Sequence, residues 1–234
     1  MLELGGSDPF IILEDADLEA AVRVGVRARF QNAGQSCIAA KRFIVVESVF
    51  HAFQESFVEA VRALKVGDPM DPATQIGPLA RGDLRDDLER QVRDSVLQGA
   101  EVLTGGRRLP GRGYFFAPTV LADTQPPMPV CREEVFGPVA ALMKVIDADA
   151  AIRAANHCHH GLGSSLWTSD LDRARRMARE IEAGQVFING MVVSDPRLPF
   201  GGVKRSGYGR ELSEFGIREF VNIQTVWIGP AVNR

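Results

Sequence analysis

Short apolar runs alternate along the chain with longer segments whose apolar side chains recur every three or four positions. Residues 42–47 form a β-branched run, which predicts a buried strand. Residues 49–64 follow with Phe50, Phe53 and Phe57 at helical spacing, which predicts an amphipathic helix. Because strands joined by helices of this length pack into one layered domain, the pattern predicts an α/β fold with a mostly parallel sheet flanked by helices.

The remaining elements follow from the same periodicities. Asp17 is the expected N-cap of a helix that runs toward Phe30, and Gly99 and Gly184 are expected to end two later helices. Further helices are predicted at residues 83–98, 147–156, 171–182 and 213–220. Further extended segments are predicted at residues 102–104, 114–121, 135–145, 164–168, 185–189 and 221–228. A long loop is expected at residues 196–209.

Composition and charge narrow the class of protein. Of the 234 residues 45% are hydrophobic and 24% are charged, which is typical of a globular chain. The net charge of -3 and the scattered Lys and Arg residues give no footprint for nucleic acid. No apolar run reaches the roughly 18 to 20 residues that span a bilayer. With no signal-peptide pattern in residues 1–6, we expect a cytoplasmic protein with no membrane or nucleic-acid partner.

Cysteine and histidine usage argues against disulfides and metal. Three widely spaced cysteines and no CxxC pair make a poor disulfide framework and a poor structural zinc site. The run from His157 to His160 includes Cys158, but consecutive side chains cannot easily face one ion, so we expect no metal. Walker A, HExxH and GxSxG patterns are absent, and the stretch from Gly201 to Gly207 has the wrong spacing for a phosphate loop.

The candidate chemistry lies in a polar, glycine-containing turn, residues 31–37, which ends at Cys37. A thiol in such a turn can lie beside free backbone N–H groups, which lower the pKa of a thiol and can hold an oxyanion. Free cysteine is more often a small buried hydrophobe, and the spacing alone does not separate these two interpretations.

Four segments in order resemble motifs of the aldehyde dehydrogenase superfamily: residues 2–6, 31–37, 133–139 and 199–211. The resemblance covers essentially the whole chain and is strongest to bacterial succinate-semialdehyde dehydrogenases. It implies an aldehyde dehydrogenase-like catalytic domain at residues 1–210. Residues 211–234 would form a C-terminal helix and an oligomerisation strand, which pairs subunits into dimers or tetramers by edge addition. By this resemblance, the N-terminal cofactor domain of the family would lie mostly outside the chain.

The resemblance implies a role for each matching residue. Cys37 would attack the aldehyde as a thiolate to form a thiohemiacetal, and its N–H would stabilise the oxyanion. Hydride transfer to NAD or NADP would leave a thioester, and Glu3 would activate the hydrolytic water. Glu134, Phe136 and Leu4 would bind the cofactor, Glu134 through the ribose hydroxyls. Without the resemblance, Glu3 would be interpreted as part of a charged terminus, and Glu134 and Phe136 as part of a turn with a core phenylalanine.

Substrate recognition is assigned to the loop before Phe200. Ser194 stands where such enzymes contact the succinate-semialdehyde carboxylate, whereas Gln31 stands where many have an arginine. Glutamine supplies no charge for a bidentate grip, so Arg29 or Arg197 would have to compensate. Ala39 replaces the second cysteine of a redox switch, so no switch is expected. Cys131 and Cys158 match no catalytic motif and are interpreted as structural or incidental.

Three functions remain open. The first is NAD(P)-dependent oxidation of succinate semialdehyde, with a chain that is poorly active alone because an asparagine of the oxyanion hole belongs to the missing half. Losing one oxyanion donor typically lowers the rate by about 100- to 1000-fold. The second is an aldehyde dehydrogenase for another aliphatic or aromatic aldehyde. The third is a non-catalytic oligomerisation module. A thiolate that reacts well below about pH 8.5 would favour catalysis.

Overall fold

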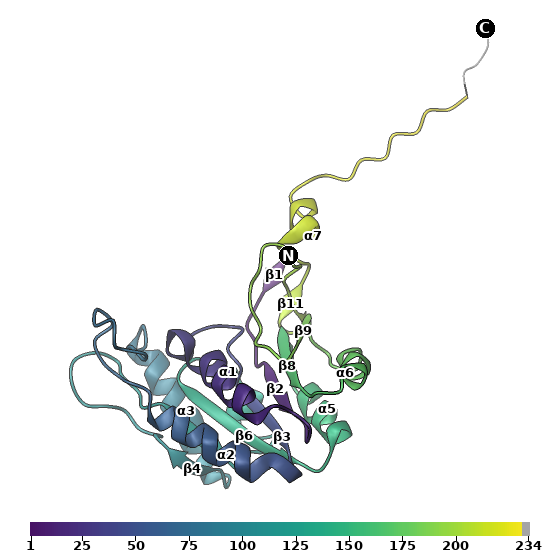
Figure 1. Ribbon diagram of the computed structural model, residues 1–234. Helices are drawn as coiled ribbons and strands as arrows, with labels where there is room; N and C mark the ends of the chain where they lie inside the picture. The colour runs from purple at the N-terminus through teal and green to yellow at the C-terminus, as the bar shows by residue number, and fades with distance from the viewer. Residues whose placement is uncertain (231–234) are drawn as a thin grey trace.

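A computed structural model describes residues 1–230 and contains the predicted, mainly parallel sheet (Figure 1). Neighbouring strands of this seven-stranded sheet are parallel, except β4 and β5, which are antiparallel. The strand order across the sheet is β4 (Glu101–Thr104), β5 (Thr119–Ala122), β6 (Val139–Val145), β3 (Arg42–Val46), β2 (Pro9–Ile12), β8 (Gly163–Trp167) and β9 (Gln185–Ile188).

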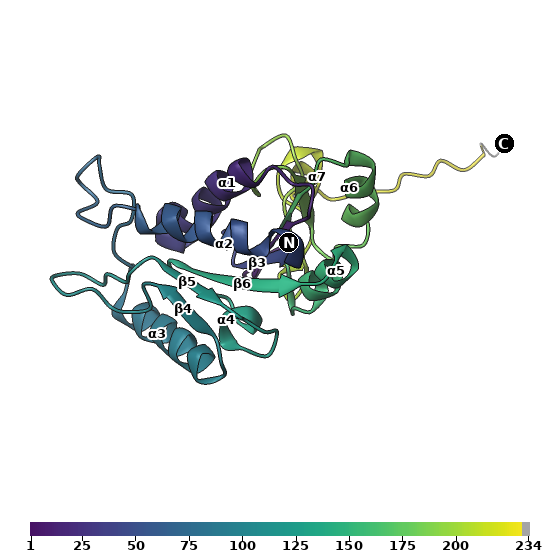
Figure 2. The same ribbon diagram turned by 60° about the horizontal axis from the view of Figure 1, so that its bottom comes forward.

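Helices cover both faces of the sheet (Figure 2). One face packs on α1 (Leu18–Phe30) and α2 (Glu47–Arg62), through an aromatic cluster that includes Phe43, Phe53 and Phe57. The other face packs on a second apolar cluster, which takes side chains from four helices. These are α3 (Gly82–Leu97), α4 (Pro129–Arg132), α5 (Ala148–Asn156) and α6 (Leu171–Ala178).

The predicted N-cap at Asp17 is confirmed, but one central strand was not predicted. The Asp17 carboxylate accepts a hydrogen bond from the Ala20 N–H at 3.0 Å, as an N-cap does. Strand β2 was missed although it lies between β3 and β8. Its side chains alternate between the two faces, with Phe10 in the cluster under α1 and Ile11 in the cluster under α5.

Two predicted boundaries were wrong. The strand expected at residues 135–145 begins at Val139, because Pro138 has no N–H and the residues before it form a loop. The helix expected at residues 171–182 ends at Ala178, so Gly184 does not cap it. Gly184 instead lies where a side chain would collide with the Gly201 backbone, which explains the glycine by close approach.

Short elements project from the sheet on the side of the N-terminus (Figure 1). Strand β1 (Leu2–Glu3) pairs with β11 (Gly207–Tyr208), and β10 (Val203–Lys204) pairs with β7 (His160–Gly161). Helix α7 (Ser213–Arg218) follows. Residues 221–228 run away from the body, are exposed, and pair with no strand of residues 1–230. Because the predicted strand would pair with a second subunit, it stays a prediction. Residues 231–234 of the predicted C-terminal region, residues 211–234, lie outside the described residues.

None of the helices in residues 1–230 combines the length and the apolar character that crossing a membrane requires.

Candidate active site

The site lies where the central parallel strands begin. Asp8 directly precedes β2, Lys41 directly precedes β3 and Pro138 directly precedes β6. Backbone hydrogen bonds join the starts of these strands. The Lys41 N–H donates to the Asp8 carbonyl at 3.0 Å, and the Lys41 carbonyl accepts from the Ala141 N–H at 3.1 Å. The turn that carries Cys37 leads into β3 and therefore sits at this amino-terminal edge of the sheet.

Close backbone packing holds the Cys37 turn in place. The stretch η1 (Gln31–Gly34) contains left-handed residues, with φ of 74° at Gly34. A side chain at Gly34 would collide with the Gly137 carbonyl and the Arg29 guanidinium, so the glycine is required there. A Cβ at Gly6 would lie 2.6 Å from the Cys37 carbonyl oxygen. The backbone of residues 5–6 therefore lies directly against the Cys37 turn.

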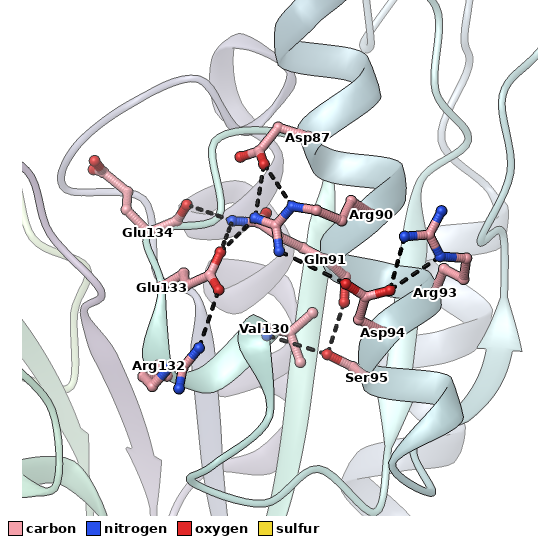
Figure 3. A network of polar contacts seen from close by, with 10 residues as sticks. All are labelled: Asp87, Arg90, Gln91, Arg93, Asp94, Ser95, Val130, Arg132, Glu133 and Glu134. Carbon is pink, nitrogen blue, oxygen red and sulfur yellow. Dashed lines mark hydrogen bonds and ion pairs between the residues drawn. The ribbon is translucent and has the colours of Figure 1, made fainter.

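The Glu134 side chain contacts the same segment, residues 5–6, although it is distant in the sequence. One carboxylate oxygen, Oε1, accepts a hydrogen bond from the Gly6 N–H at 2.9 Å. The loop that carries Glu134 is anchored on α3, because the Gln91 amide donates to the Glu134 carbonyl at 3.1 Å and to Glu133 at 3.2 Å. Figure 3 shows the Glu134 carboxylate pointing away from this network. Three predicted segments, residues 2–6, 31–37 and 133–139, thus meet around Gly6.

Glu3 is placed by the fourth segment. It lies in β1 opposite Gly207 of β11, and its carboxyl interacts with that of Glu211. Glu211 is in turn fixed by a pair of backbone bonds with Phe200, at 2.7 and 2.8 Å. Burial raises the pKa of Glu3, and the neighbouring charge of Glu211 raises it further. A carboxylate with a raised pKa is a stronger base than an ordinary one.

The surroundings of Cys37 act on its thiol in both directions. Burial raises the pKa of the Cys37 thiol above its ordinary value, although the Lys41 charge and the Ile38 N–H lower it. The charges of Asp8 and Glu3 act in the same direction as burial. The effect of Glu3 on Cys37 also means that the two groups are close enough to interact. The net effect disfavours the thiolate, so a nearby base would assist ionisation of Cys37.

Charged side chains lie fully buried beneath the turn. Asp8, Arg29, Lys41 and Arg42 each expose 1% of their surface or less. Burial raises the pKa of Asp8 to about 6 and lowers the pKa of Lys41 to about 8. Asp8 and Lys41 were not predicted as parts of the site. The available signal was that each directly precedes a run that forms a buried strand.

Neither arginine proposed to compensate for Gln31 is free to do so. The Arg29 guanidinium donates to the carbonyls of Gly34, Ala40, Val135 and Gly137, in the interior. Arg197 is exposed and pairs with Asp195 at 2.6 Å. That expectation was therefore wrong. Arg29 already donates to backbone carbonyls, and Arg197 already forms an ion pair with Asp195 in its own loop.

The remaining predicted residues lie at different depths. Ser194 is exposed, Phe200 is buried and Phe136 is half-buried. Leu4 is 60% exposed, and its N–H donates to the Ser206 carbonyl at 3.0 Å. Gln31 lines a pocket between α1 and residues 64–76, and its amide nitrogen is buried without a protein partner. Their roles in binding substrate and cofactor stay predictions.

The two other cysteines differ from each other. Cys131 belongs to α4 and is buried. Cys158 accepts a hydrogen bond from the His160 N–H at 3.5 Å, and its sulfur lies 4.0 Å from the His160 ring nitrogen Nδ1. Burial raises the pKa of Cys158, but the hydrogen bonds from His160 and the Arg42 charge outweigh it and bring the pKa to about 7. In residues 1–230, no three His, Cys, Asp or Glu side chains gather as a metal site.

Comparison with known proteins identifies the class. Residues 1–226 match the model of the aldehyde dehydrogenase family, and the chain belongs to that family. It is 57% identical over 231 residues to succinate-semialdehyde dehydrogenase (NADP(+)) of Mycolicibacterium paratuberculosis, covering 99% of this chain and 49% of that protein. It is 55% identical over 227 residues to succinate semialdehyde dehydrogenase (NAD(P)+) Sad of Escherichia coli (strain K12), covering 97% of this chain and 49% of that protein.

The fold has the same relatives. A crystal structure of succinate-semialdehyde dehydrogenase from Burkholderia pseudomallei superposes with a TM-score of 0.91 and 41% identity, covering 94% of this chain and 46% of that one. These matches confirm the predicted aldehyde dehydrogenase-like α/β fold. The chain spans about half the length of the curated relatives it matches, which share 49% of their own length with it.

Proposed function

We propose that this chain is the catalytic half of an NAD(P)-dependent aldehyde dehydrogenase that oxidises succinate semialdehyde to succinate through Cys37. The observation that carries the proposal is the meeting of three distant segments at Gly6, which packs on the Cys37 carbonyl and donates to Glu134. The names of the relatives supply the substrate and the cofactor class.

Carbon–sulfur bond formation is the first step. The Cys37 thiol gives its proton to a base, and the sulfur bonds to the aldehyde carbon as the carbonyl oxygen becomes an oxyanion. Within residues 1–230 the Cys37 N–H donates to no backbone acceptor, so it is available to this oxyanion. The product is a thiohemiacetal on Cys37.

A bound NAD or NADP would supply the hydride acceptor that turns this thiohemiacetal into a thioester. Glu134 fits a ribose: Oε1 is held by Gly6, and within residues 1–230 its other oxygen has no hydrogen-bond partner. That second oxygen lies against Gly5, where a Cβ would come within 2.5 Å of it. Phe136 and Leu4, which are partly exposed, would pack beside the bound group.

Glu3 performs the last step. Its carboxylate takes a proton from water, the hydroxide adds to the thioester carbon, and the carbon–sulfur bond breaks to release succinate. The Cys37 thiolate then takes up a proton. The raised pKa of Glu3 supports this role, because burial and Glu211 make its carboxylate more basic.

Recognition of the substrate carboxylate rests on Ser194 and Gln31, since Arg29 and Arg197 are already paired. Two polar neutral side chains discriminate against a neutral aldehyde less than an arginine fork does. The alternative substrate, another aliphatic or aromatic aldehyde, is favoured because both arginines named for this role already have partners.

The chain alone is expected to be a poor dehydrogenase. Burial raises the pKa of Cys37, which disfavours the nucleophilic thiolate. A role in assembly with other subunits is favoured by the exposed apolar side chains of the C-terminal segment, including Phe220, Ile223 and Trp227.

Protection of Cys37 against alkylation tests the proposed function without requiring turnover. Succinate semialdehyde should slow the reaction of Cys37 with iodoacetamide, because the thiohemiacetal removes the free sulfur, and peptide mapping should show Cys158 unprotected. Succinate, which has no aldehyde, is the matched control. Protection by benzaldehyde and hexanal but not by succinate semialdehyde would support the alternative substrate. Absence of protection by any aldehyde would refute Cys37 as the nucleophile.

A further inference from the structure

Lys41 is a buried cation whose hydrogen bonds all end in the Cys37 turn, which here includes the residues that follow Cys37 up to Ala39. Its ammonium group donates to the carbonyl oxygens of Ser36 at 3.2 Å, Cys37 at 2.8 Å and Ala39 at 2.9 Å. A lysine ammonium has three N–H donors, so the turn takes all of them. The Lys41 side chain is 0% exposed, which leaves no solvent to replace these bonds.

These bonds fix the direction of two N–H groups. The Ser36 carbonyl shares a planar peptide unit with the Cys37 N–H, and the Cys37 carbonyl shares one with the Ile38 N–H. In a trans peptide the C=O and the N–H point in opposite directions. Because Lys41 holds both carbonyls, both N–H groups point away from the ammonium. The Ile38 N–H is directed at the Cys37 sulfur, whose pKa it lowers.

The charge of Lys41 acts on the same sulfur. Cys37 is faced by Lys41, whose charge lowers its pKa, and by Asp8 and Glu3, whose charges raise it. Lys41 itself is faced by Arg29, Asp8, Glu134 and Cys37. Since burial lowers the pKa of Lys41 only to about 8, the group is mainly charged at neutral pH.

Arg42 provides a comparison that separates position from burial. It is also buried, and its guanidinium also donates to three backbone carbonyls, those of Ser7, Ala154 and Ala155. None of these carbonyls belongs to the Cys37 turn. Loss of Arg42 should therefore destabilise the fold without changing the chemistry of Cys37.

We propose that Lys41 is a positioning residue of the nucleophile: its three hydrogen bonds orient the N–H groups of Cys37 and Ile38, and its charge supports the thiolate. The proposal rests on the proposed function of Cys37. It adds a residue that acts through the turn and does not touch the substrate.

The test is the pH dependence of Cys37 alkylation by iodoacetamide, measured in the full chain with Cys158→Ser as background. Lys41→Met should raise the pKa of Cys37 by one unit or more and slow its alkylation about tenfold near pH 8, because an opposite charge nearby typically shifts a pKa by one to three units. Lys41→Arg, which keeps a charge and donors, should recover part of the rate. Arg42→Met should lower the urea midpoint but leave the pH profile of Cys37 unchanged.

A folded Lys41→Met variant with the parent pH profile would overturn the proposal. An equal shift in Arg42→Met would do the same, because it would make the effect one of general destabilisation. If Lys41→Met does not fold by circular dichroism, Lys41→Gln gives the same readout with a neutral side chain that keeps two donors. Failure of aldehydes to protect Cys37 in the parent would instead refute the proposed function, so the two failures are distinguishable.

Discussion

Replacing Arg29 with methionine should destabilise the protein strongly, because this one side chain ties three parts of the site together. Its guanidinium bonds the carbonyls of Gly34 and Ala40, on either side of Cys37, and that of Gly137 after Glu134. It is 0% exposed, so water cannot take its place. Burial lowers the pKa of Arg29 only to about 9, so the charge is present at neutral pH.

The size of the effect follows from the groups left behind. Methionine occupies the space of the aliphatic stem but donates no hydrogen bond, so several buried carbonyls lose their partner. Leaving a buried polar group unpaired costs about 1–3 kcal/mol, and breaking a buried charged cluster costs about 3–5 kcal/mol. We therefore expect the free energy of unfolding to fall by about 3–5 kcal/mol. With a urea m-value of about 2–3 kcal/mol/M, the midpoint should fall by about 1–2.5 M.

Urea titration followed by circular dichroism measures this change. Arg27→Met is the matched control, since Arg27 is exposed on the same helix and the substitution is identical. The free energy of unfolding of this control should stay within about 0.5 kcal/mol of that of the parent. A drop of less than about 1 kcal/mol for Arg29→Met, or an equal drop for both variants, would contradict the role of Arg29 as the tie beneath the site.

Three further predictions concern pH, thiols and assembly. Burial raises the pKa of Asp8 from 3.8 to about 6, so between these pH values the folded state holds a proton that the unfolded state has lost, and the free energy of unfolding should fall as pH rises. Asp8→Asn should flatten this part of a plot of unfolding free energy against pH. An unchanged slope would contradict the role of Asp8. Near pH 7.5, iodoacetamide should label Cys158 faster than Cys37 in peptide maps. The reason is that His160 brings the pKa of Cys158 to about 7, whereas burial raises the pKa of Cys37. Faster labelling of Cys37 would refute this order of reactivity. A chain that ends at Phe220 should be monomeric by light scattering while the full chain forms dimers or tetramers, and equal masses would disprove assembly through the C-terminal segment.

Local signals in the sequence predicted the helices well. Asp17 and Asp147 cap α1 and α5 through their own side chains, and such caps involve only residues three positions apart. Strand β2 was missed because its four residues have no flanking periodicity. It is a strand because β3 and β8 pair with it on both sides, and pairing between distant segments cannot be read from four residues.

The site was predicted in part. The order of the four segments indicated Cys37, Glu3 and Glu134, but not that they meet at the amino-terminal edge of the sheet. The general rule for open α/β sheets places ligands at the carboxyl ends of the strands, so that rule would have misplaced the site. Lys41 was also missed, because lysine is almost never fully buried and its burial here depends on carbonyls of a turn.

Acyl transfer to Cys37 tests the central claim most directly. After reaction with p-nitrophenyl acetate, peptide mass spectrometry should find an acetyl group on Cys37, and this group should persist longer in Glu3→Gln than in the parent because the base that activates water is lost. Acetyl on Cys158 serves as the internal reference and should clear at the same rate in both proteins. If Cys37 carries no acetyl group, or if Glu3→Gln clears it as fast as the parent does, the assignment of nucleophile and base is wrong.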